Sequence, residues 1–83
     1  MKREEIKIQL AQLIQEHSPG VDVEEITEKT RLEEDLQMGS LEMFELTMAI
    51  EENFDFAFDD SEQDELMSAT VGDLVTVILK KSA

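Results

Sequence analysis

The chain of 83 residues is 41% hydrophobic, which is enough for one compact core, so we expect residues 1–83 to form a single domain. There is no cysteine, which excludes a disulfide framework, a thiolate metal site and a thiol nucleophile. The formal net charge of −14 argues against nucleic acid and anionic membranes as partners. With no secretory signal and no membrane-spanning apolar run, we expect a cytoplasmic monomer that inserts in no membrane.

Helical periodicity predicts a first helix close to the N-terminus. Its apolar residues recur at spacings of i, i+4, i+7 and i+8, and they are Ile6, Leu10, Leu13 and Ile14. This spacing puts them on one face of a helix, where they can pack on the core. The Ser-Pro-Gly sequence at 18–20 ends the helix, because proline and glycine punctuate regular structure.

Residues 21–39 show neither strand alternation nor sustained helical periodicity. Apolar residues are scattered through the stretch, at Val21, Val23, Ile26, Leu32 and Leu36. We interpret it as a long loop that these anchors pin to the core, with room for one helical turn. A loop of this length is unusual in a compact domain and is often functional.

A second helix is predicted from about residue 40 to 53, and its apolar residues form two stripes instead of one. At about 100° per residue, one side of this helix gathers Met43, Leu46, Ile50 and Phe54. The nearly opposite side gathers Leu41, Phe44 and Met48, which we call the second stripe. A helix with two apolar sides is either buried all round or presents one side to a partner.

The charges around the second stripe favour a partner. Glu45 and Glu52 border the stripe on one side and Glu51 borders it on the other. Residues 32–79 hold fourteen acids and no Lys or Arg, so these carboxylates would be buried without a counter-ion close in sequence. We therefore expect an exposed docking surface with an acidic rim that attracts basic protein patches. The alternative is that the second stripe belongs to the core.

Two further helical segments complete the predicted fold. A short turn or helix is expected within residues 60–67, and a last helix begins near Thr70. Its single apolar stripe comprises Val71, Leu74, Val75, Ile78 and Leu79. Lys80 and Lys81 follow at its C-terminal end, where cations interact favourably with the helix dipole. The predicted fold class is all-α, a small four-helix bundle with three longer helices and one short helix.

Ser40 follows Gly39 at the predicted start of the second helix, and two roles are open for it. As an N-cap, its hydroxyl oxygen would accept a hydrogen bond from a free N–H of the first turn. A capping box, however, would need Glu or Gln at position 43, where the sequence has Met43. Alternatively, Ser40 is displayed for modification, because the dipole at a helix N-terminus favours an attached phosphate.

The stretches ITEKTRLEEDLQMGSLEMFELTMAIEENFDFAF and TVGDLVTVI resemble the acyl carrier protein family, and the resemblance covers essentially the whole chain. It implies a phosphoprotein whose serine, here Ser40, receives a covalent 4′-phosphopantetheine arm from coenzyme A. It further implies a carrier that holds acyl intermediates as thioesters in fatty-acid or polyketide-type biosynthesis. The positions that match the family's docking surface are Leu41, Glu42, Phe44, Glu45, Met48, Glu51 and Glu52. The implied partners are a phosphopantetheinyl transferase and the acyl-loading and synthase enzymes, which dock through basic patches.

The chain departs from the family pattern Leu-Gly-x-Asp-Ser-Leu just before the serine. Gly39 replaces the usual aspartate and Gln37 replaces the usual glycine. Because a charge-assisted contact is lost, we expect a general transferase to modify this chain slowly and the variant Gly39→Asp faster. The alternative is that the neighbouring acids Glu34, Asp35 and Glu42 already supply enough charge.

An enzyme is not expected. His17 is the only histidine and stands at the end of the first helix, and there is no glycine-rich phosphate loop or nucleophile elbow. The acidic run at 55–65 lacks the glycine and the alternating ligands of an EF-hand, so no metal site is expected. Two alternatives to a fatty-acid carrier stay open. One is a carrier for aminoacyl or other non-fatty cargo, and the other is a carrier-like interaction module that never receives the arm.

Overall fold

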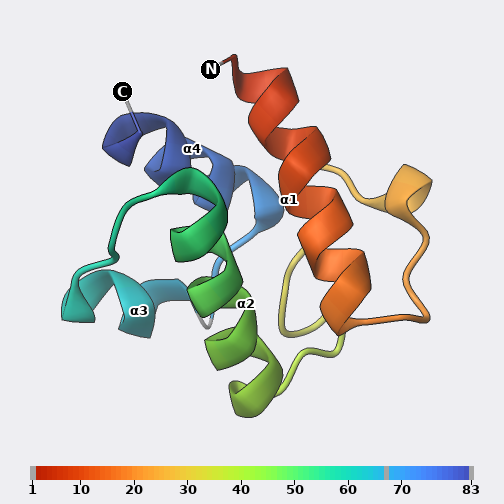
Figure 1. The fold of residues 1–83 in the computed structure, drawn as a ribbon. Coiled ribbons are helices and arrows are strands. Elements are labelled where there is room, and N and C mark those ends of the chain that lie inside the picture. Colours follow the sequence, from red (N-terminus) through yellow and green to blue (C-terminus); the bar gives the residue numbers. More distant parts are fainter. Residues whose placement is uncertain (1, 67, 83) are drawn as a thin grey trace.

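The computed structural model describes residues 2–66 and 68–82, and every regular element in these two ranges is helical. The elements are α1 (Arg3–His17), the 3₁₀ turn η1 (Val23–Glu25), α2 (Ser40–Phe54), α3 (Asp60–Leu66) and α4 (Val71–Lys81) (Figure 1). The predicted all-α bundle of three longer helices and one short helix is therefore confirmed. Of the segment predicted to hold the short helix, Met67 lies outside the described residues.

The three longer helices bury the apolar faces that their periodicity predicts. α1 packs against both α2 and α4, and it runs opposite to α2 (Figure 1). From α1, Ile6, Leu10 and Ile14 have no exposed surface, and Leu13 packs at the edge of the core. The buried residues of α2 and α4 include Met43, Leu46, Ile50, Phe54, Val71, Leu74, Val75 and Ile78. The short α3 contributes one buried residue, Leu66, so it adds little to the core.

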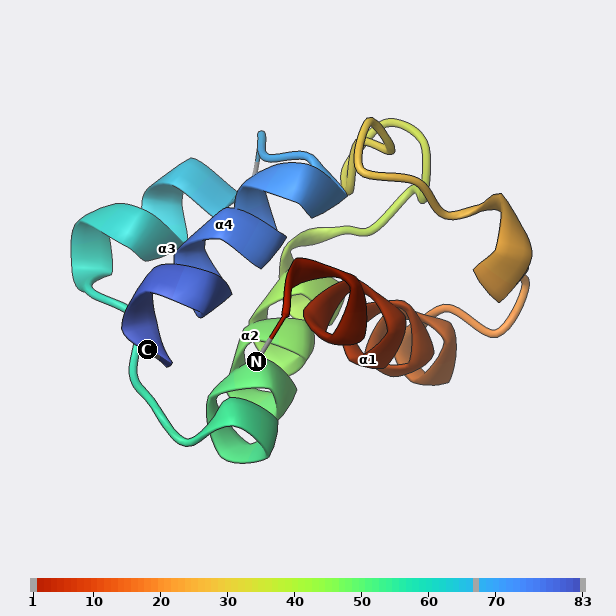
Figure 2. The same ribbon diagram turned by 90° about the horizontal axis from the view of Figure 1, so that it is seen from above.

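Residues 18–39 connect α1 to α2 as a long loop pinned to the core, as predicted. Ile26 and Leu32 are buried, and the remaining expected anchors pack against the core. The loop passes through η1, where the side chain of Asp22 accepts a hydrogen bond from the N–H of Glu24. Figure 2 shows this segment projecting beside α1, away from α3. One further anchor, Met38, is 1% exposed and was not predicted from the sequence.

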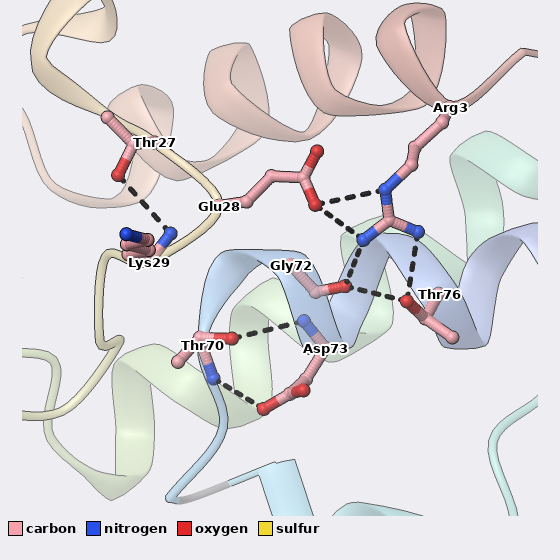
Figure 3. A network of polar contacts seen from close by, with 8 residues as sticks. All are labelled: Arg3, Thr27, Glu28, Lys29, Thr70, Gly72, Asp73 and Thr76. Atoms are coloured by element: carbon pink, nitrogen blue, oxygen red, sulfur yellow. Dashed lines mark hydrogen bonds and ion pairs between the residues drawn. The ribbon is translucent and has the colours of Figure 1, made fainter.

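A network of hydrogen bonds fastens the loop and α1 to the start of α4 (Figure 3). The guanidinium of Arg3 donates from Nε to Glu28 at 2.9 Å and from its terminal nitrogens to Thr76 Oγ1 and the Gly72 carbonyl. In return, the N–H of Gly72 donates to the Glu28 carbonyl at 2.8 Å. Three segments far apart in sequence are thus tied together at one place, and their geometry fixes where α4 begins.

The N-terminus of α4 also carries a complete capping box. The Thr70 hydroxyl accepts from the N–H of Asp73, and the Asp73 carboxylate accepts from the N–H of Thr70 (Figure 3). The N–H of Val71 donates to the carbonyl of Thr30 in the loop. These bonds satisfy donors at the helix start that have no partner within the helix. An isolated antiparallel bridge between Arg31 and Thr70 continues the same contact.

Gly72 is expected to be needed for this close approach of loop and helix. A Cβ on Gly72 would lie 2.9 Å from the carbonyl oxygen of Glu28, a backbone atom that cannot swing aside. We expect Gly72→Ala to lower the free energy of unfolding by about 1–3 kcal/mol, measured by urea denaturation, although alanine favours helix more than glycine. Gly20→Ala is the control, because nothing lies within 4 Å of a Cβ there. Equal stability of Gly72→Ala and the unchanged chain would show that the loop moves without cost.

Candidate functional site around Ser40

Ser40 is the first residue of α2, and Gly39 is the N-cap. The N-cap alternative for Ser40 is therefore wrong, because the chain enters the helix one residue earlier than that role requires. Gly39 has the extended backbone of a cap, with φ −81° and ψ −178°, and has no side chain to close it. Ser40 is exposed at this helix start, a place where the helix dipole favours a phosphate.

The segment that leads into Ser40 is fixed by burial and by backbone hydrogen bonds. The side chain of Met38, two residues before the serine, is 1% exposed, and its N–H donates to the carbonyl of Leu32. Gln37 has φ 53°, the left-handed region that usually takes glycine. Gln37 stands where the family pattern has its glycine, so a side-chain-bearing residue here adopts a backbone conformation that glycine adopts more easily.

We expect Gln37→Gly to stabilise the protein by up to about 1 kcal/mol. The left-handed conformation costs a side-chain-bearing residue about 1–2 kcal/mol, and the greater freedom of glycine in the unfolded chain offsets part of the gain. Thermal unfolding measures the difference. As a control, Gln12→Gly on the exposed face of α1 is expected to destabilise by about 1 kcal/mol, as glycine does in helix interiors. Destabilisation by Gln37→Gly would mean that the glutamine side chain makes a contact worth more than the strain.

The second stripe is exposed, as predicted. Leu41, Phe44 and Met48 are 68%, 57% and 48% exposed, whereas the opposite stripe of α2 is buried. The alternative that these three residues belong to the core is wrong. Three large apolar side chains along one helix face, exposed within one acidic segment, have the composition of a protein-binding surface: apolar in the middle and charged at the rim.

The predicted rim acids lie in different surroundings. Glu52 is exposed, and Glu45 lies with Oε2 3.7 Å from Nδ1 of His17, at the end of α1. Glu51 accepts a hydrogen bond of 2.8 Å from the N–H of Phe58, so this carboxylate also holds the connection from α2 to α3. The rim acids therefore lie on the same helix as the second stripe, and Glu51 also stabilises the connection to α3.

Three further acids were predicted to lie near Ser40, and they fall into two groups. Glu34 and Asp35 are both paired with Arg31. The Asp35 carboxylate accepts hydrogen bonds from the backbone N–H of Arg31 and from the Arg31 guanidinium. The backbone bond first, and the side-chain bond second, lower the pKa of Asp35. Glu42, in the first turn of α2, instead folds back over Gly39, where its Oε2 lies 3.1 Å from the position that a Cβ would occupy.

A small hollow of about 190 Å³ opens directly beside Ser40, between α2 and α3. Its residues are Ser40, Met43, Phe44, Thr47, Gln63, Asp64 and Leu66. A larger groove of about 620 Å³ lies between α3 and α4, but Ser40 is not part of it. Phe56 and Phe58 form an edge-to-face pair with ring centroids 4.9 Å apart, and neither ring lines the hollow beside Ser40.

Lys81 holds α3 in place through contacts that were not predicted from the sequence. Its Nζ lies 2.8 Å from Glu62 Oε1 and 3.5 Å from Asp59 Oδ2, and it donates to the carbonyl of Ala57. The bond to Lys81 lowers the pKa of Glu62. A signal was present, because a lysine pair directly follows a long segment with no other cation. Through this contact the end of α4 positions the helix that forms one wall of the hollow.

Ser40 and its surroundings fit a covalently attached phosphodiester. The serine is exposed and does not cap the helix, so attachment would break no bond of the fold. The adjacent hollow combines apolar and polar walls, which suits the start of a flexible amide chain. In residues 2–66 and 68–82, no cluster of three or more His, Cys, Asp or Glu is placed to hold a metal ion. Within the same residues, none of the helices has the length and apolar character needed to cross a bilayer.

Comparisons with known proteins give a consistent picture. The family described as phosphopantetheine attachment site matches residues 9–78. The acyl carrier protein of Exiguobacterium sp. is 37% identical over 81 residues, which is 98% of this chain and 99% of that protein. The acyl carrier protein of Chlamydia felis is 48% identical over 59 residues, which is 71% of this chain and 73% of that protein. Among solved structures, the acyl carrier protein from Enterococcus faecalis matches with a TM-score of 0.79 at 25% identity, over 98% of this chain and 99% of that one.

Proposed function

The chain belongs to the acyl carrier protein family, and from this membership we propose that residues 1–83 act as a single carrier domain whose arm is attached to Ser40. As a member of that family, it is a carrier of acyl groups with 4′-phosphopantetheine as its covalent cofactor. When attached, the arm supplies a terminal thiol that holds the acyl group as a thioester. The observation that carries the assignment to Ser40 is its exposed, non-capping position at the N-terminus of α2.

The attachment needs one phosphoryl-transfer step. Ser40 Oγ forms a bond to the phosphorus on the pantetheine side of coenzyme A, and the phosphoanhydride bond breaks. Adenosine 3′,5′-bisphosphate leaves with the electron pair of that bond. The hydroxyl proton of Ser40 passes to a base that the transferase supplies. The positive end of the α2 dipole then stabilises the negative charge of the phosphodiester.

We propose that partners dock on the second stripe and on the acids around it, which are the rim acids and Glu42. Leu41, Phe44 and Met48 would fill apolar pockets of a partner, and the flexible Met48 suits contacts with several enzymes. Around them, Glu42, Glu45, Glu51 and Glu52 would meet basic side chains and steer the encounter. The proposed partners are the phosphopantetheinyl transferase and the acyl-loading and synthase enzymes. Delivery of cargo among such enzymes suits a cytoplasmic carrier that is monomeric and performs no catalysis of its own.

Intact-mass measurement tests the proposed attachment. The purified chain is incubated with coenzyme A and a broad-specificity phosphopantetheinyl transferase, then digested so that the modified peptide can be located. The expected result is an added mass of one phosphopantetheinyl group on the peptide that contains Ser40. A second addition of one acyl group on the new thiol, after incubation with an acyl-loading enzyme, tests the carrier role. A chain that stays at its original mass would favour the carrier-like module that never receives the arm.

A further inference from the structure

The family has an aspartate just before the serine, and this chain lacks it. A neighbouring acid nevertheless places a negative charge at the same part of the surface. Gly39 removes the aspartate, and three nearby acids are able in principle to replace its charge: Glu34, Asp35 and Glu42. They differ in what surrounds them, and the difference selects one.

Glu34 and Asp35 are excluded by Arg31. The guanidinium of Arg31 contacts both carboxylates, and Nη2 lies 3.2 Å from Asp35 Oδ1. The N–H of Arg31 adds a hydrogen bond of 2.8 Å to the same carboxylate. The two acids and Arg31 together keep a net charge of about −1, but both carboxylates already bond the guanidinium, so fewer of their lone pairs are open to an approaching protein.

Glu42 is placed differently. It is the third residue of α2, and its side chain folds back toward the N-cap, as N3 glutamates do in capping boxes. Its carboxylate approaches Gly39 so closely that a Cβ there would lie 3.1 Å from Oε2 and 3.8 Å from Cδ. None of the ion pairs formed within residues 2–66 and 68–82 involves Glu42. The negative charge of Glu42 therefore lies beside the residue that precedes Ser40, and the missing side chain of Gly39 makes room for it.

We propose that Glu42 is the specificity-determining residue for attachment of the arm: its carboxylate occupies the space over Gly39 and offers a basic side chain of the transferase the charge that an aspartate at 39 would otherwise supply. This inference rests on the proposed attachment at Ser40. Glu42 does not touch the reacting atoms, so its effect falls on binding of the transferase and not on phosphoryl transfer itself. Gly39 and Glu42 are then a matched pair, since a side chain at residue 39 would crowd the Glu42 carboxylate.

The pairing favours the alternative left open by the sequence, that a neighbouring acid already supplies the charge, over the expectation that Gly39→Asp is modified faster. An aspartate at 39 would meet Glu42 within contact distance, and two carboxylates at one place repel each other. Gly39→Asp alone should therefore change kcat/KM of the transferase by less than about fivefold, the scale of one exposed charge pair. Glu42→Gln should lower kcat/KM roughly ten- to hundredfold, the scale of a lost charge-assisted contact.

The decisive variant is the double substitution. Gly39→Asp with Glu42→Gln moves the carboxylate from one position to the other, and we expect it to recover most of the activity that Glu42→Gln loses. The control is Glu24→Gln on η1, which removes the same charge from an exposed glutamate in the loop before α2. The loss in Glu42→Gln should appear in KM and shrink at high salt, and its thermal unfolding should stay close to that of the control.

The outcomes separate the two proposals. If the unchanged chain takes up no arm, the attachment at Ser40 fails and the inference on Glu42 fails with it. If the chain is modified but Glu42→Gln is no slower than Glu24→Gln, only the inference on Glu42 is overturned. A tenfold faster reaction of Gly39→Asp in the unchanged background would overturn it as well, because the charge would then be missing rather than replaced.

Discussion

Replacing Ser40 by alanine is expected to abolish uptake of the arm completely. The reaction needs an oxygen nucleophile, and alanine has none, so no slow residual reaction at this position is possible. The folded state should be unaffected, because Ser40 is exposed and Gly39, not Ser40, caps α2. Loss of an N-cap typically costs about 0.5–2 kcal/mol, so an unchanged melting temperature would separately check the position of the cap. Mass spectrometry after incubation with coenzyme A and transferase gives the result directly.

Ser61→Ala is the matched control for this experiment. Ser61 is also exposed and also lies in the first turn of a helix, α3, but no apolar stripe follows it along that helix. The other described serines are less suited as controls, since Ser68 and Ser82 donate their hydroxyls to backbone carbonyls and Ser18 lies at the C-terminal end of α1. We expect Ser61→Ala to take up the arm at the rate of the unchanged chain. An adduct that survives Ser40→Ala would move the attachment site elsewhere.

Replacing Phe44 by alanine is expected to weaken partner binding by about 2 kcal/mol, or roughly thirtyfold in Kd. Phe44 stands in the middle of the second stripe and 57% of it is exposed, so its ring is available to a partner and contributes little to the core. Its loss should therefore appear mainly as faster dissociation, with the fold retained. Surface plasmon resonance with the transferase, or with a synthase from the same source, separates the two rate constants.

Ile8→Ala provides the matched control on another helix. Ile8 lies on α1 and is also 57% exposed, so Ile8→Ala removes an equally exposed apolar side chain outside the second stripe. We expect Ile8→Ala to bind partners as the unchanged chain does. Equal binding by Phe44→Ala and Ile8→Ala would exclude the second stripe as the docking surface.

The rim acids should act on the association rate instead. Association rate constants should fall as salt rises, because the screening length shrinks from about 10 Å at 0.1 M to about 3 Å at 1 M.

The sequence by itself determined the helical faces and hence the fold class. Residues three or four apart lie on one face of any α-helix, so the buried stripe of α1 could be predicted without knowing what it contacts. The same argument separated the two stripes of α2. Here the absence of Lys and Arg from residues 32–79 decided which stripe stays in water. The spacing of apolar and charged residues is a local property, so it can be read without knowing how the helices are arranged.

Only the tertiary structure decided how the residues around Ser40 share their roles. The sequence left two roles open for Ser40, and the structure makes Gly39 the cap, with Ser40 as the first helical residue. Which acid keeps its charge available depends on where Arg31 lies, and the spacing of charges in sequence does not give that distance. Helix α3 is similarly placed by Lys81, which lies far along the chain from its partner Glu62. Charges and caps act through distances of a few ångströms, and those distances exist only once the segments have packed.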